Sequence, residues 1–99
     1  MELQIHNTNG RIEIKGNFTS GNVNKVKDYF NYLLDHYEEV VMCLNNVHQV
    51  DKSALKVLKN IYAKAQKRSK VLFVLGKGNK KVFRALKRNQ LTHIFRNDY

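Results

Sequence analysis

The chain has 99 residues, of which 42% are apolar and 26% are charged. This length supports one hydrophobic core and excludes two independent domains, and the apolar share excludes wholesale disorder, so we expect a single domain over residues 1–99. The formal net charge of +10 is uneven, because residues 1–50 hold four basic and six acidic residues (net −2), whereas residues 51–99 hold fourteen basic and two acidic residues (net +12).

The first half of the chain predicts a hairpin, a helix and a buried strand. Two short stretches of alternating apolar and polar residues flank Asn9-Gly10, a dipeptide that favours a tight hairpin turn. Apolar residues then recur at three- and four-residue steps over residues 23–37, which predicts a helix of about four to five turns with Ser20 as its N-cap. The continuous apolar run at residues 40–44 predicts a strand that is buried on both faces, as in a parallel sheet.

The second half predicts two more helices around a second buried strand. Asp51 is suited to cap a helix whose apolar stripe runs from Leu55 to Ala65. A buried strand at residues 71–75 and a short helix follow, and residues 91–95 close the core, in a loop or a last short strand. This order predicts an α/β fold, a layered domain with a mixed, mostly parallel β-sheet of four to five strands, an N-terminal hairpin and three to four helices.

Several absences narrow the class of protein. No apolar run approaches the roughly 20 residues that span a bilayer, and the N-terminus lacks the pattern of a secretory signal. The one cysteine, Cys43, lies in an apolar run and is expected to be buried. The four histidines show no ligand spacing, and no zinc pattern is present. We therefore expect a cytoplasmic protein without a membrane span, a metal, a cofactor or catalytic residues.

The basic second half offers a candidate anion site. Lys77, Lys80, Lys81 and Arg84 surround the start of the third predicted helix, where backbone N–H groups favour a phosphate. The stretch does not match a phosphate-binding loop, so a plain strand-to-helix turn is the simpler interpretation. Nucleic acid binding through these basic residues is a less favoured prediction, because the nearby aromatic residues have core spacing. A solvated face or a docking surface for an acidic protein accounts for the charge equally well.

The most informative segment leads from the apolar run at residues 40–44, through a predicted short loop, into the helix that Asp51 begins. Ser53 lies in the first turn of that helix, where N–H groups lack helical partners. The helix dipole would stabilise a phosphate there by roughly 0.3–1 kcal/mol, and by up to about 2 kcal/mol in a partly buried site. Such a site is suited to be a switch, and the alternative is that Asp51 and Ser53 only cap the helix.

At this segment the sequence resembles the STAS family, the domain of bacterial anti-sigma factor antagonists. Asp51-Lys52-Ser53-Ala54-Leu55 is similar to the Asp-Ser-Ser-Gly-Leu that opens a helix in that family. The resemblance extends over nearly the whole chain, since residues 14–18 resemble the family's early strand that ends in glycine, and residues 71–76 resemble a later strand. It implies a STAS-like fold and a regulatory protein that is not an enzyme.

The resemblance also implies a mechanism, in which signalling proteins exchange partners and thereby regulate transcription. An unphosphorylated antagonist binds an anti-sigma factor that is a serine kinase, which frees a sigma factor, and phosphorylation breaks the complex; a phosphatase is a further implied partner. Carried over by position, Ser53 is the candidate phosphoacceptor. The implied partner-binding residues are Asp51, Lys52, Ser53, Ala54 and Leu55.

Two departures from the family pattern keep alternatives open. Lys52 replaces the first serine of the motif, and Ala54 replaces its glycine, a change expected to crowd the approach of a kinase loop. One alternative is therefore a divergent STAS binding module that is not phosphorylated. The other is a protein that binds a polyanion or nucleic acid through its basic helices.

Overall fold

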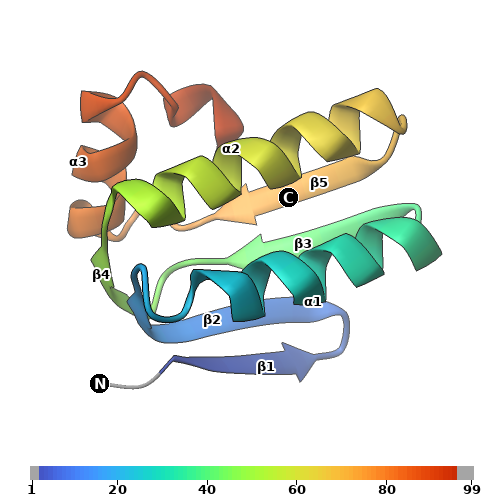
Figure 1. Ribbon diagram of the computed structural model, residues 1–99, viewed down its shortest axis with the longest axis horizontal. Helices are drawn as coiled ribbons and strands as arrows, with labels where there is room; N and C mark the ends of the chain where they lie inside the picture. Colours follow the sequence, from blue (N-terminus) through green and yellow to red (C-terminus); the bar gives the residue numbers. More distant parts are fainter. Residues whose placement is uncertain (1–2, 96–99) are drawn as a thin grey trace.

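The computed structural model describes residues 3–95, which form five strands, three α-helices and one 3-10 helix (Figure 1). The elements in order are β1 (Gln4–Thr8), β2 (Arg11–Phe18), α1 (Val23–His36), β3 (Glu39–Cys43), β4 (Val47–Val50), α2 (Lys52–Lys67), β5 (Val71–Leu75), α3 (Lys80–Arg88) and the 3-10 helix Thr92–Ile94. No helix within these residues is long and apolar enough to cross a membrane. The α/β fold predicted from the sequence is confirmed.

The five strands form one mixed sheet. β1 pairs antiparallel with β2, β2 pairs parallel with β3, and β3 pairs parallel with β5. The predicted hairpin turn is present, with Asn9 and Gly10 both at positive φ. At Gly16, whose φ is +105°, the register of β2 shifts, and the last part of β2 then pairs parallel with β4. The end of β4 is thereby placed beside the end of β2.

The strand β4 corrects the sequence prediction, which treated the residues between β3 and α2 as a loop. Its four residues include the exposed polar pair His48 and Gln49, so the segment carries no readable hydrophobic period. Its strand conformation depends on pairing with β2, and the backbone N–H of Gly16 donates to the carbonyl of Asn46 just before the strand, at 3.2 Å. A contact of this kind is invisible to local sequence patterns.

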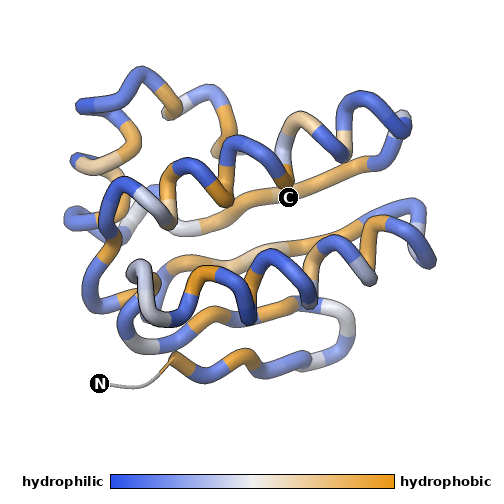
Figure 2. Tube along the Cα trace, viewed as in Figure 1, coloured by the Kyte–Doolittle hydropathy of each residue, from blue (hydrophilic) through white to orange (hydrophobic). Residues whose placement is uncertain are grey.

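The helices cover the sheet from one side and from one end. α1 and α2 contact each other and lie side by side over one face, whereas α3 packs against β4 at the end of the sheet (Figure 1). Apolar stretches of the helices and strands lie between the two layers, and the sides of the helices that face away from the strands are polar (Figure 2). The largest fully buried side chains include Ile14, Phe18, Phe30, Leu34 and Met42.

The ends of α1 differ from the prediction. Asn22 rather than Ser20 is the N-cap, and its side chain makes no capping hydrogen bond but donates to the carbonyl of Asn17, at 2.8 Å. Tyr37 follows the helix instead of completing its apolar stripe, and it is 56% exposed. The spacing of apolar residues therefore located the buried face correctly but extended it one residue beyond the helix.

The two apolar runs differ in burial. All of residues 40–44 are buried, as predicted for a strand covered on both faces, and Cys43 is among them. The prediction of a second buried strand was wrong for one face of β5, because Val71 is 40% exposed while Leu72 is buried. The closing residues form a 3-10 helix, and Phe95 makes only an isolated bridge to β5 in place of a last strand.

Candidate functional site

Asp51 joins two segments of the chain at the N-terminus of α2. Its Oδ1 accepts hydrogen bonds from the hydroxyl of Ser53, at 2.7 Å, and from the backbone N–H of Ala54, at 3.0 Å. Its Oδ2 accepts from the backbone N–H of Ser20, at 2.8 Å, so the loop between β2 and α1 is held against the start of α2. The prediction that Asp51 caps this helix is confirmed.

These contacts keep Asp51 ionised. Partial burial raises the pKa of the Asp51 carboxyl, but hydrogen bonds from the Ser53 hydroxyl and from the backbone N–H groups of Ala54, Ser20 and Ser53 outweigh it and hold that pKa below its ordinary value of 3.8. The carboxyl group is therefore a carboxylate at neutral pH. It places one full negative charge at the positive end of the α2 dipole, which is the favourable arrangement.

Ser53 is the second residue of α2 and is half-buried. Its hydroxyl hydrogen points to the Asp51 carboxylate, which fixes the side-chain rotamer, and its oxygen accepts no hydrogen bond from residues 3–95. A carboxylate that accepts the proton of a hydroxyl raises the electron density on the oxygen and prepares it for attack on an electrophile. The site is therefore suited to accept a transferred group on Ser53.

The five residues predicted to bind a partner come together at the start of α2, but they differ in exposure. Lys52 is exposed, and Asp51 and Ser53 are half-buried. Ala54 and Leu55 are buried in the core, so their side chains position the turn from the inside. The first three therefore present most of the side-chain surface of this segment, and Leu55, which is 7% exposed, adds a small apolar edge.

The four residues predicted to bind an anion are exposed but are not equivalent. Lys81 and Arg84 line a groove of about 370 Å³ that also includes Asp51, whereas Lys77 and Lys80 are not part of its wall. The groove lies between α3 and β4, which pack against each other. The structure thus brings half of the predicted anion site next to the Ser53 segment.

Asn79 is the residue that the sequence prediction missed. Its Oδ1 accepts from the backbone N–H of Val82, at 3.3 Å, and caps α3. Its Nδ2 donates to the carbonyls of Leu44, Asn45 and Val47, at 3.1, 3.2 and 2.8 Å. Asn79 thus occupies the N–H of Val82 that a phosphate would have used. An asparagine before a helix signals a cap, but its contacts with residues more than 30 positions away leave no local signal.

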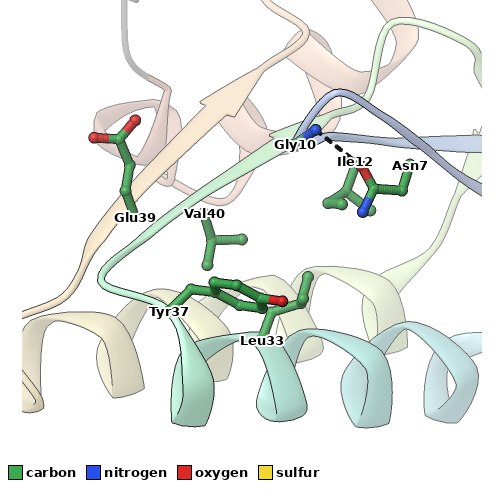
Figure 3. A pocket seen from close by; sticks show the side chains of 7 residues that line it. All are labelled: Asn7, Gly10, Ile12, Leu33, Tyr37, Glu39 and Val40. Carbon is green, nitrogen blue, oxygen red and sulfur yellow. Dashed lines mark hydrogen bonds between the residues drawn. The ribbon is translucent and has the colours of Figure 1, made fainter.

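A second depression, of about 200 Å³, is lined by residues of the β1–β2 hairpin and of the end of α1 (Figure 3). These segments lie at the opposite end of the molecule from the start of α2 (Figure 1). Leu33, Tyr37 and Val40 form its apolar wall, and the carboxylate of Glu39 points away from it (Figure 3). Within residues 3–95, no three His, Cys, Asp or Glu side chains are placed to hold a metal ion. The Asp51 and Ser53 segment is therefore the better candidate site.

The family model of the STAS domain matches residues 1–98. An anti-sigma factor antagonist from Mycobacterium paratuberculosis has a similar structure, with a TM-score of 0.77 and 16% identity over 95% of this chain and 81% of that chain. The unphosphorylated form of the anti-sigma factor antagonist SpoIIAA is similar too, with a TM-score of 0.75 and 9% identity over 99% of this chain and 89% of that chain. No curated protein sequence matches the chain.

Proposed function

The chain belongs to the STAS domain family, and from that membership we propose that it is a bacterial anti-sigma factor antagonist controlled by phosphorylation of Ser53. It acts by binding, not by catalysis. Its partner is an anti-sigma factor with serine kinase activity, and the surface that the partner contacts centres on Asp51, Lys52 and Ser53. A phosphatase that reverses the modification completes the cycle.

The observation that carries this proposal is the geometry at the start of α2. The Ser53 hydroxyl lies 2.7 Å from an ionised carboxylate in the first turn of a 16-residue helix. The helix dipole favours negative charge at that position, so both the hydroxyl and its phosphorylated form are accommodated. The exposed Lys52 beside it supplies a counter-charge for a phosphate.

Phosphorylation would remodel this turn for a definite reason. The transferred phosphate replaces the hydroxyl proton, so Ser53 can no longer donate to Asp51 and instead brings further negative charge beside the carboxylate. The phosphate then competes with Asp51 for the N–H groups at the helix start, including that of Ala54. Because Asp51 also holds the backbone of Ser20, the disturbance reaches the loop between β2 and α1.

The replacement of the family glycine by Ala54 does not oppose this proposal. The residue is fully buried, so its methyl group faces the core and leaves the approach to Ser53 open. We therefore expect this methyl group not to crowd an approaching kinase loop.

The test is phosphorylation measured by intact-mass spectrometry. Wild type and variants are incubated with ATP and with extract of the source organism, which contains its serine kinases. We expect one added phosphate on wild type and on Ser20→Ala, a matched control that changes an exposed serine whose backbone alone contacts Asp51. Ser53→Ala should gain none. Absence of any phosphate that depends on Ser53 would leave a STAS binding module without the switch.

A further inference from the structure

The groove between α3 and β4 carries a row of cations. Lys81, Arg84 and Arg88 line it from α3, and their spacing of three and four residues places them on one face of the helix. His48 of β4 and Asp51 lie in the same groove. All three cations are exposed.

Within the part of the chain that the structure describes, these cations form no ion pair. Among residues 3–95, the ion pairs join Asp35 to Lys64 and Arg68, and Glu38 to Lys70, so none involves α3. The sequence of α3 contains no acidic residue. The carboxylate of Asp51 already accepts hydrogen bonds from Ser53, Ala54 and Ser20 and is not paired with a cation of the groove.

The lining of the groove indicates what kind of anion it fits. Half-buried Val50 and Ala85 contribute apolar surface between the cations. The large apolar side chains that are exposed within residues 3–95, Tyr32, Tyr37 and Val71, lie outside the groove, so no exposed Phe or Tyr ring is available there to stack on bases, and the aromatic ring that does line the groove is the small imidazole of His48. A groove that combines three cations with some apolar surface complements a protein segment that carries both acidic and apolar side chains.

We propose that this groove docks an acidic segment of the partner protein, a contact that adds to the one at Ser53. The identity of that partner rests on the proposed function, whereas the charge argument does not depend on phosphorylation. The hydroxyl of Ser53 is hydrogen-bonded to Asp51, which lines the groove, so a phosphate on Ser53 and an acidic segment in the groove bring charges of the same sign together. Phosphorylation thus weakens docking through electrostatic repulsion.

The test measures peptide binding by fluorescence anisotropy at low salt, with NMR chemical shifts to locate the contact. The probe is a short labelled peptide with glutamates and leucines along one face, compared with the same peptide carrying glutamines. Wild type should bind only the acidic peptide, with shifts centred on Arg84 and Arg88. The variant Arg84→Glu/Arg88→Glu should bind it roughly tenfold more weakly, and Arg84→Gln/Arg88→Gln should give an intermediate loss.

The matched control is Lys25→Glu/Lys27→Glu, which makes the same charge change on exposed positions of α1, outside the groove. It should retain near wild-type affinity. An equal loss in the control, or no binding of the acidic peptide by wild type, overturns the proposal. A single-stranded thymidine oligonucleotide that binds more tightly than the peptide through Arg84 and Arg88 also overturns it. Binding of the acidic peptide does not depend on whether Ser53 can be phosphorylated, so the docking proposal and the phosphorylation proposal can fail separately.

Discussion

Removing the side chain of Asn79 should destabilise the fold through two separable contacts. The variant Asn79→Ala loses the cap on α3, which is worth about 1 kcal/mol. It also loses the donor to the three carbonyls of the segment that connects β3 to β4. Those carbonyls regain only part of this bonding from water or neighbouring amides, which adds about 1 kcal/mol more. We expect the free energy of unfolding to fall by about 2 kcal/mol in total.

Urea denaturation followed by circular dichroism measures this loss, and thermal unfolding should show a decrease in Tm of roughly 8–16 °C. Two variants separate the contributions. Asn79→Asp keeps a capping oxygen of equal quality but has no N–H group to donate, so its loss of stability reports the lost carbonyl bridge together with the repulsion between the new carboxylate oxygen and those carbonyls. Asn89→Ala is the matched control, because Asn89 ends the same helix with one exposed hydrogen bond to Ala85, and it should cost less than about 0.5 kcal/mol.

Two results would refute this reasoning. If Asn79→Asp were as stable as wild type, the bridge to the three carbonyls would contribute nothing. If Asn89→Ala were as destabilising as Asn79→Ala, the position of the asparagine in the fold would be irrelevant.

Three further predictions concern single residues. Folding lowers the pKa of Asp51, so its ionised form stabilises the protein fully above the ordinary value of 3.8 and progressively less as the pH falls below that value. The difference in free energy of unfolding between wild type and Asp51→Asn, measured by urea denaturation, should therefore be constant near neutral pH and become smaller in acid. Gly76→Ala should lower the free energy of unfolding by about 1–3 kcal/mol, because the φ of Gly76 is +142° and the new Cβ would lie 2.9 Å from the Cβ of Leu44. Gly78→Ala is the control, because a Cβ at Gly78 would have no atom within 4 Å, and an equal loss of stability there would contradict the argument. Asp35→Asn breaks surface ion pairs with the half-buried Lys64 of α2 and with the exposed Arg68 that follows it, and it should leave the urea midpoint within error of wild type.

The parts of the fold that could be predicted are those whose stabilising contacts are local. Residues that are close together in the sequence determine the apolar stripes of α1 and α2 and the Asn9-Gly10 turn. Each of these features was predicted correctly to within a few positions. β4 could not be predicted, because a strand of four residues is defined by its partner rather than by its own sequence. The exposure of one face of β5 could not be predicted for a similar reason, since burial depends on which elements cover the sheet.

The same division holds for the candidate site. The cap by Asp51 was predictable, because a carboxylate and the N–H three residues later are close in any helix that begins there. The hydrogen bond from the backbone N–H of Ser20 to Asp51 joins residues 31 positions apart, and no sequence pattern in either segment predicts it. The groove beside Asp51 was equally hidden, because it exists only where α3 lies against β4.

The hydrogen bond between Ser20 and Asp51 has a consequence for timing within the cell. Asp51 and Arg84, which line one groove, lie more than 30 residues apart in the chain, and Ser20 is as far from Asp51 on the other side. During synthesis the first two segments leave the ribosome well before α3 does. A partner that needs the complete surface would therefore bind only chains that have finished folding, and not nascent or unfolded ones.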